Sequence, residues 1–194
     1  IVYYKFLDEY NQRFIGACIS LSPARSPSNG FCRVSYIEKM VDFFDYVIES
    51  TGFDLLLFPH LAIDLPALQE ISHAMKHFNK VTIFPEVLGW RYQIDMIGRA
   101  DFFISARYHP TIFAVKAGTP FMCIVNQYKV EGMLSKIGLN VERCWQDEPL
   151  ENYIIVFDRI YSKKVQLSQA ITDANARAHN IAKVYRQLLE SLEL

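Results

Sequence analysis

The chain has 194 residues, of which 51% are hydrophobic and 21% charged, a composition typical of one folded domain and incompatible with a disordered polyelectrolyte. Its formal net charge of -1, from 20 Lys+Arg against 21 Asp+Glu, offers no overall attraction to nucleic acid, so any anion site has to be local. The 4 cysteines form no CxxC pair, and no apolar run approaches the roughly 18 residues that span a bilayer. We therefore predict no metal site, no transmembrane segment and a cytoplasmic location.

Short apolar runs alternate with amphipathic segments along the chain. Residues 1–13 begin without Met and are interpreted as a connector from something earlier, in a fragment or a processed chain. Five apolar runs follow, at residues 14–21, 53–59, 80–84, 101–105 and 120–125. Their nearly continuous hydrophobicity is typical of parallel strands covered on both faces. Residues 14–148 are thus predicted to form an α/β domain with a Rossmann-like, doubly wound parallel sheet.

Amphipathic segments fill the gaps between these strands. They predict helices at residues 34–52, 66–78, 90–99, 110–118 and 128–138. In the first of these, Ser35 and Glu38 have the spacing of a capping box, and Gly52 suits the helix end. His73 and His77 lie four residues apart but lack a third metal ligand, so we interpret them as part of a solvated helix face.

Residues 149–194 are predicted to be helical throughout. An apolar stripe, with steps of four and three residues, runs from Leu167 through Ile171, Ala174 and Ala178 to Leu192. This pattern favours a long C-terminal helix that packs back on the domain or on its partner. A self-associating coiled coil, and with it a homo-oligomer, is the alternative.

The segment "ARYHPT" (106–111) follows the fourth apolar run and opens the next helix. Ligands of parallel sheets bind at the carboxyl ends of the strands, and a helix N-terminus attracts anions. Arg107 adds a planar guanidinium suited to phosphate or carboxylate, and His109 can donate to the same anion or transfer a proton. The structural alternatives are a helix-capping His109 and a surface ion pair of Arg107.

Further polar residues are expected at the same edge of the sheet. His60 follows the second apolar run, with Asp64 four residues later, although a loop histidine and a helix-capping aspartate are alternatives. Lys129 and Glu131 open the helix after the fifth run. A lysine at the positive end of a helix is unfavourable unless an anion is nearby, which favours a binding site there.

The run "GRADFFISARYHPTIFAVKAGTPFMCIVNQYKVEGMLSKIGL" (98–139) resembles the C-terminal signature of the polysaccharide pyruvyl transferase family, and "LLLFPHLAID" (55–64) is similar to the family's second-strand loop. The resemblance implies a GT-B-type architecture of two Rossmann domains, of which this chain is the C-terminal, donor-binding half. It also implies transfer of pyruvate from phosphoenolpyruvate to two sugar hydroxyls as a cyclic ketal, in the biosynthesis of cell-surface polysaccharides.

The resemblance also suggests residue roles. Arg107, Lys129, Arg25 and the first turn of the helix around Thr111 are expected to bind the donor. His109 is the expected acid, and His60 is the second candidate for proton transfer. Asp64 and Glu131 are further candidates, for contacts with the acceptor or within the loops.

Phosphoenolpyruvate is expected as a donor substrate, with no separate cofactor. The expected acceptor is a sugar or lipid-linked oligosaccharide, through which a cytoplasmic enzyme could associate with a membrane. We expect the isolated chain to be inactive without its N-terminal half. Two other functions stay open: a nucleotide-sugar glycosyltransferase of the same architecture, in which Glu131 touches a ribose, and a non-catalytic binding module.

Overall fold

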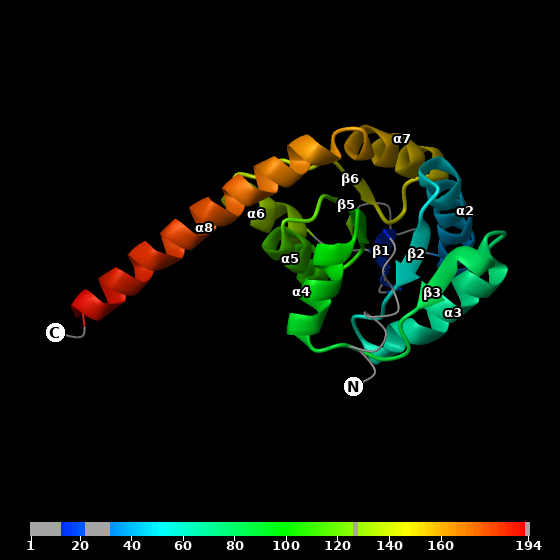
Figure 1. Ribbon diagram of the computed structural model, residues 1–194, viewed down its shortest axis with the longest axis horizontal. Helices are drawn as coiled ribbons and strands as arrows, with labels where there is room; N and C mark the ends of the chain where they lie inside the picture. The colour runs from blue at the N-terminus through cyan, green and yellow to red at the C-terminus, as the bar shows by residue number, and fades with distance from the viewer. Residues whose placement is uncertain (1–12, 22–31, 126–127, 193–194) are drawn as a thin grey trace.

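Strands and helices alternate along the part of the chain that the computed structural model describes, residues 13–21, 32–125 and 128–192 (Figure 1). The strands are β1 (Phe14–Cys18), β2 (Asp54–Leu57), β3 (Val81–Ile83), β4 (Phe102–Ser105), β5 (Phe121–Val125) and β6 (Arg143–Trp145). The α-helices are α2 (Arg33–Thr51), α3 (Leu65–Ala74), α4 (Trp90–Arg99), α5 (Tyr108–Ala117), α6 (Lys129–Lys136), α7 (Leu150–Tyr161) and α8 (Lys164–Leu192). Two short 3-10 turns, η1 (Ala62–Asp64) and η2 (Phe78–Lys80), flank α3.

The six strands form one parallel sheet in the order β3-β2-β1-β4-β5-β6. The chain builds one half of the sheet outward from β1, crosses over to β4 and builds the other half, so strand order reverses between β1 and β4. This is the doubly wound, Rossmann-type sheet that the sequence predicts, and the described residues of β1, β4 and β5 are buried throughout. The short strand β6 was not predicted.

Helices cover both faces of the sheet. Helices α2, α3 and α7 lie on one side, and α4, α5 and α6 on the other (Figure 1). Aromatic side chains join α7 to α2: the ring of Phe43 meets Tyr153 edge-on at 5.3 Å and Phe157 at 5.9 Å. Because apolar helices shield both faces, the strands need no alternation of polar and apolar residues.

Helix α2 begins differently from the prediction. Cys32 is the N-cap, with an extended backbone, and no side chain caps the helix. Ser35 therefore lies inside the first turn, and the predicted capping box of Ser35 and Glu38 is wrong. The predicted helix end is confirmed, because Gly52 has a left-handed φ of 74° and its amide donates to the Ile48 carbonyl.

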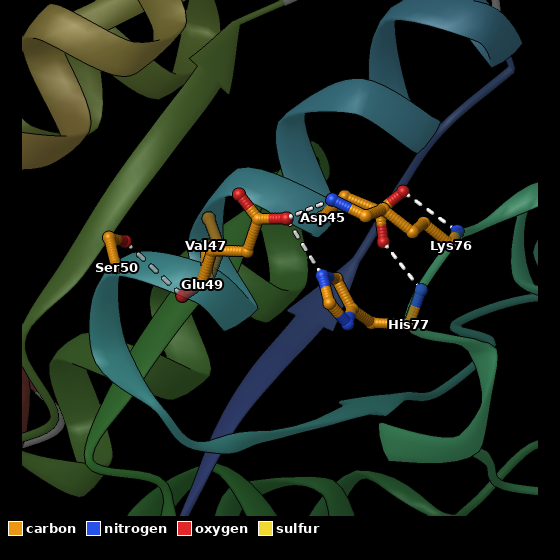
Figure 2. A network of polar contacts seen from close by, with 6 residues as sticks. All are labelled: Asp45, Val47, Glu49, Ser50, Lys76 and His77. Carbon is orange, nitrogen blue, oxygen red and sulfur yellow. Dashed lines mark hydrogen bonds and ion pairs between the residues drawn. The ribbon is translucent and has the colours of Figure 1, made fainter.

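Helix α3 ends at Ala74, earlier than predicted, where α2 holds the following turn (Figure 2). The Asp45 carboxylate accepts the backbone amides of Lys76 and His77, both at 2.9 Å. Glu49 accepts the Lys76 ammonium and the His77 ring nitrogen, both at 2.8 Å. His77 thus lies beyond the helix, and its side chain pairs with Glu49 instead of sharing a helix face with His73.

The first half of α8 packs on the domain. Ile171 and Ala174 are fully buried, and the Ser168 hydroxyl donates to the Gly118 carbonyl at 2.9 Å. Arg177 reaches the Ile137 carbonyl at 3.3 Å. Beyond these contacts α8 extends away from the sheet towards the C-terminus (Figure 1). The coiled-coil alternative, which was drawn from the stripe between Leu167 and Leu192, stays a prediction.

Candidate functional site

The carboxyl ends of β1, β2 and β4 meet at the reversal of strand order, where open α/β sheets bind ligands. Two predicted segments meet at this edge, the residues after β2 and those after β4. Arg25 belongs to residues 22–31, which lie outside the described residues. The site is therefore built from the segments after β2 and β4.

Arg107 and Asp64 form a buried ion pair at this edge. The side chain of Asp64 is 2% exposed and that of Arg107 13% exposed, and Asp64 Oδ1 accepts from Arg107 Nη2. Arg107 Nε also donates to the Ile19 carbonyl at 3.3 Å. The guanidinium is thus held between the ends of β1 and β2. Arg107 forms an ion pair, as the structural alternative predicted, but this pair is buried and not on the surface.

Asp64 also holds the loop after β2. Its Oδ2 accepts the backbone amides of His60 at 3.2 Å and Leu61 at 2.9 Å. Both carboxylate oxygens are thus engaged within the protein. Asp64 orients Arg107 and His60, which differs from the expected contact with an acceptor and matches the alternative of a capping aspartate.

Helix α5 begins at Tyr108, two residues before the predicted start, with Arg107 as N-cap. The Thr111 amide donates to the Arg107 carbonyl at 3.2 Å, and the Thr111 hydroxyl donates to the same carbonyl at 2.8 Å. The Ser105 hydroxyl donates there too, at 3.0 Å. The expectation that the amide of Thr111 faces the donor is wrong, because the early helix start places this amide in the hydrogen-bond ladder. Thr111 positions Arg107 instead.

Two imidazole rings lie beside Arg107. The ring centroids of His60 and His109 are 5.6 Å apart, and both rings lie near Phe113, at 6.2 and 6.5 Å. Burial lowers the pKa of His60, and the charges of Arg107 and His109 lower it further. A hydrogen bond with Gln93 and the charge of Asp64 oppose this shift. The neutral form of His60 is therefore favoured, whereas His109 is exposed in the first turn of α5.

The start of α6 lies next to this group through Tyr108. Lys129 Nζ lies 4.8 Å from the centre of the Tyr108 ring, and both residues line an open cavity of about 440 Å³ between α5 and α6. Glu131 instead forms an ion pair with Arg143. The structure thus brings Lys129 close to the segment of Arg107 and His109, and gives Glu131 a different partner.

These positions define a group of basic side chains, made of Arg107, His109 and Lys129 at the N-termini of α5 and α6, with neutral His60 alongside. Such an arrangement can bind a small anion with more than one negative charge and move a proton next to it. In the described ranges, no group of three or more His, Cys, Asp or Glu side chains is arranged to hold a metal ion. No helix in those ranges is long and apolar enough to cross a membrane.

Two residues of the site were not predicted, Gln93 and Phe113. Gln93 precedes the buried Met96 and Ile97 by three and four residues on α4, so it lies on the same buried helix face. A polar side chain at an apolar position of the helical period was the available signal. Phe113 carried no such signal, because an aromatic residue is ordinary on a packed helix.

The fold is a Rossmann-type domain, with the basic side chains of Arg107, His109 and Lys129 at the carboxyl edge of its sheet. A model of the polysaccharide pyruvyl transferase family matches residues 19–128, more than half of the chain. The chain belongs to this family, and the resemblance seen in the sequence is confirmed. None of the curated proteins compared with the chain matches it.

Solved structures share the fold at low identity. A family 9 glycosyl transferase from Veillonella parvula is 13% identical, with a TM-score of 0.55, over 83% of this chain and 50% of that one. A UDP-GlcNAc 2-epimerase from Neisseria meningitidis, bound to UDP-GlcNAc, is 10% identical, with a TM-score of 0.57, over 95% of this chain and 49% of that one. The chain therefore has the Rossmann-like fold of one half of GT-B-type structures and spans about half the length of these neighbours.

Proposed function

We propose that the chain is the donor-binding part of a polysaccharide pyruvyl transferase, which transfers pyruvate from phosphoenolpyruvate to a sugar as a cyclic ketal. The observation that carries the proposal is that Arg107 and His109, from the segment after β4, meet His60, from the loop after β2, at one edge of the sheet. Membership of the family supports the type of reaction. The acceptor is proposed to be a sugar or lipid-linked oligosaccharide.

In the proposed reaction, Arg107, Lys129 and the first turn of α5 hold the phosphate and carboxylate of phosphoenolpyruvate. Their fixed charges would stabilise the donor as charge develops on the departing phosphate. Arg107 is suited to this role because Asp64 and the Ile19 carbonyl fix its guanidinium before the donor arrives. Preorganised cations need no rearrangement during the reaction.

The chemical step requires one proton donor and two proton acceptors. A proton from the acid, which we assign to His109, adds to C3 of the enol, and a sugar hydroxyl attacks the resulting cationic C2. The bond between C2 and the phosphate oxygen then breaks, and a second hydroxyl closes the ketal. The two sugar hydroxyls release two protons: one restores the acid, and the other leaves on the phosphate. The products are therefore the ketal and hydrogen phosphate.

Calorimetric titration with phosphoenolpyruvate tests the proposal. Arg107→Ala is expected to weaken binding by roughly 10-fold to 150-fold, which corresponds to about 1.5–3 kcal/mol for a hydrogen bond to a charged group. Arg107→Lys keeps a charge beside Asp64 and should bind with intermediate affinity. Arg99→Ala is the matched control, because Arg99 is an exposed arginine at the end of α4 that pairs with Asp95 at 3.4 Å.

Equal affinities of wild type, Arg107→Ala and Arg99→Ala would refute the assignment. Titration with UDP-GlcNAc examines the nucleotide-sugar alternative in the same experiment. Glu131, which that alternative assigns to a ribose, is already paired with Arg143, so this function has no supporting contact of its own in the described ranges. Tight binding of UDP-GlcNAc without binding of phosphoenolpyruvate would reverse the order of the two proposals.

A further inference from the structure

Gln93 is a buried polar side chain beside the site and has no role in the reaction as proposed so far. It is 3% exposed and comes from α4, whereas the other site residues come from the loops after β2, β4 and β5. A buried amide is costly unless its donor and acceptor atoms are both hydrogen-bonded. The partners of Gln93 therefore indicate what the residue is for.

Both ends of the Gln93 amide are fixed by hydrogen bonds. Its Nε2 donates to the Leu88 carbonyl at 2.6 Å, and its Oε1 lies 2.9 Å from His60 Nδ1. A carbonyl oxygen can only accept, so the amide nitrogen has to face Leu88. The amide oxygen is then left for His60, and because this oxygen can only accept, His60 Nδ1 has to carry a proton.

We infer that Gln93 is a positioning residue that holds the proton of neutral His60 on Nδ1, so that Nε2 is the proton-accepting atom in the site. A neutral imidazole carries one N–H group, so a proton on Nδ1 leaves a lone pair on Nε2. Within the described part of the chain, Nε2 of His60 has no hydrogen-bond partner. It is thus available to a bound hydroxyl.

The surrounding charges keep the ring in this state. Arg107 and His109 face His60 and disfavour a second proton, whereas Asp64 favours one. Burial of the ring is the largest influence and lowers the pKa of His60. The neutral form of His60, which can accept a proton, is therefore favoured.

This division of roles rests on the proposed function and makes it more specific. His60 Nε2 would accept the proton of an attacking sugar hydroxyl: the O–H bond breaks, an N–H bond forms, and the freed electron pair forms the bond to C2. His109 is then left as the proton donor. His60 cannot be the first proton donor, because its only proton is held by Gln93.

NMR of the ring nitrogens in the 15N-labelled 194-residue chain tests the inference. At pH 8, long-range proton–nitrogen correlations distinguish a protonated from an unprotonated ring nitrogen, and comparison with His60→Asn assigns the His60 signals. In wild type we expect a protonated Nδ1 and an unprotonated Nε2. In Gln93→Leu the Nδ1–H form should lose its preference, because Nδ1 loses its acceptor.

Two variants separate positioning from a general effect on the fold. Gln93→Glu keeps an oxygen that can accept from Nδ1 but replaces the amide that donates to the Leu88 carbonyl, so in this variant Nδ1–H should persist. Gln146→Leu is the matched control: Gln146 is equally buried, but its amide nitrogen donates to the Ser20 carbonyl at 2.8 Å and not to a group that holds His60. This control should leave the His60 signals unchanged.

A wild-type spectrum with the proton on Nε2 would overturn the inference. So would an unchanged tautomer in a folded Gln93→Leu variant. If Gln93→Leu fails to fold, the tautomers of His60 in wild type and in Gln93→Glu decide. Addition of phosphoenolpyruvate gives a separate result: failure to perturb the signals of His60 and His109 would contradict the proposed function but leave the tautomer assignment standing.

Discussion

The buried ion pair of Asp64 and Arg107 predicts a large and specific effect of Asp64→Asn on stability. The substitution removes the negative charge but keeps a side-chain oxygen that can accept the amides of His60 and Leu61. Breaking a buried pair by removing one charge typically costs about 3–5 kcal/mol. Arg107 keeps some contact with solvent and its bond to Ile19, so we expect about 3 kcal/mol.

Asp64→Ala separates the two functions of the carboxylate, which are to pair with Arg107 and to accept the amides of His60 and Leu61. Unlike Asp64→Asn, it leaves these two amides without their acceptor, which should add roughly 1–2 kcal/mol to the loss of stability. In a double-mutant cycle, Asp64→Asn combined with Arg107→Met should lower the free energy of unfolding by clearly less than the sum of the two single changes. Each single change leaves one buried charge without its partner, whereas the double change removes both charges.

Urea unfolding followed by near-ultraviolet circular dichroism measures these differences. Glu70→Gln is the matched control, since it neutralises a carboxylate whose ion pair with Arg33 is exposed (48% and 46%) and should change stability by less than about 1 kcal/mol. If Asp64→Asn costs no more than Glu70→Gln, the pair does not hold this edge of the sheet together.

Three further predictions concern pH and packing. Burial lowers the pKa of His60 below its usual 6.5, so as pH falls the unfolded chain takes up a proton before the folded protein does. The free energy of unfolding should therefore decrease as pH drops below about 6.5. A His60→Asn variant whose free energy of unfolding has the same slope from about pH 8 to about pH 5 would contradict this. Hydrogen bonds from Lys76 and His77 lower the pKa of Glu49 to about 2, so the stabilising effect of its charge is complete above the usual pKa of 4.5 and is lost as pH falls towards 2. The stability difference between wild type and Glu49→Gln should shrink over that interval, and a constant difference would rule the pairing out. Ile171→Ala, at a fully buried position of α8, should lower the free energy of unfolding in urea by about 2–4 kcal/mol. Val165 is 74% exposed on the same helix, so Val165→Ala should change this free energy by less than about 0.5 kcal/mol. Equal effects of the two substitutions would show that α8 does not pack on the domain.

The amino-acid sequence was sufficient to predict the layers of the fold and the edge that carries the site. Parallel strands covered on both faces have to be apolar throughout, so five of the six described strands appear as apolar runs. Since the carboxyl ends of parallel strands meet at one edge, residues directly after strands are brought together. His60, Arg107 and His109 could therefore be placed as one group before the structure was known.

Other features depended on the tertiary structure. The strand β6 is three residues long and only its central residue is buried, so it has no apolar pattern of its own. The true start of α2 is set by the extended backbone of Cys32, a conformation that the local residue types did not specify. Both misses occur where local preference is weak and packing decides.

The partners of the site residues also came only from the tertiary structure. Arg107 and Asp64 are 43 residues apart in the sequence, and Gln93 and His60 are 33 apart. Residue types and spacing identify groups that can be charged or can donate hydrogen bonds, but they do not fix which groups meet. That choice depends on how separate loops and helices are placed against one another, which the packing of the whole sheet sets.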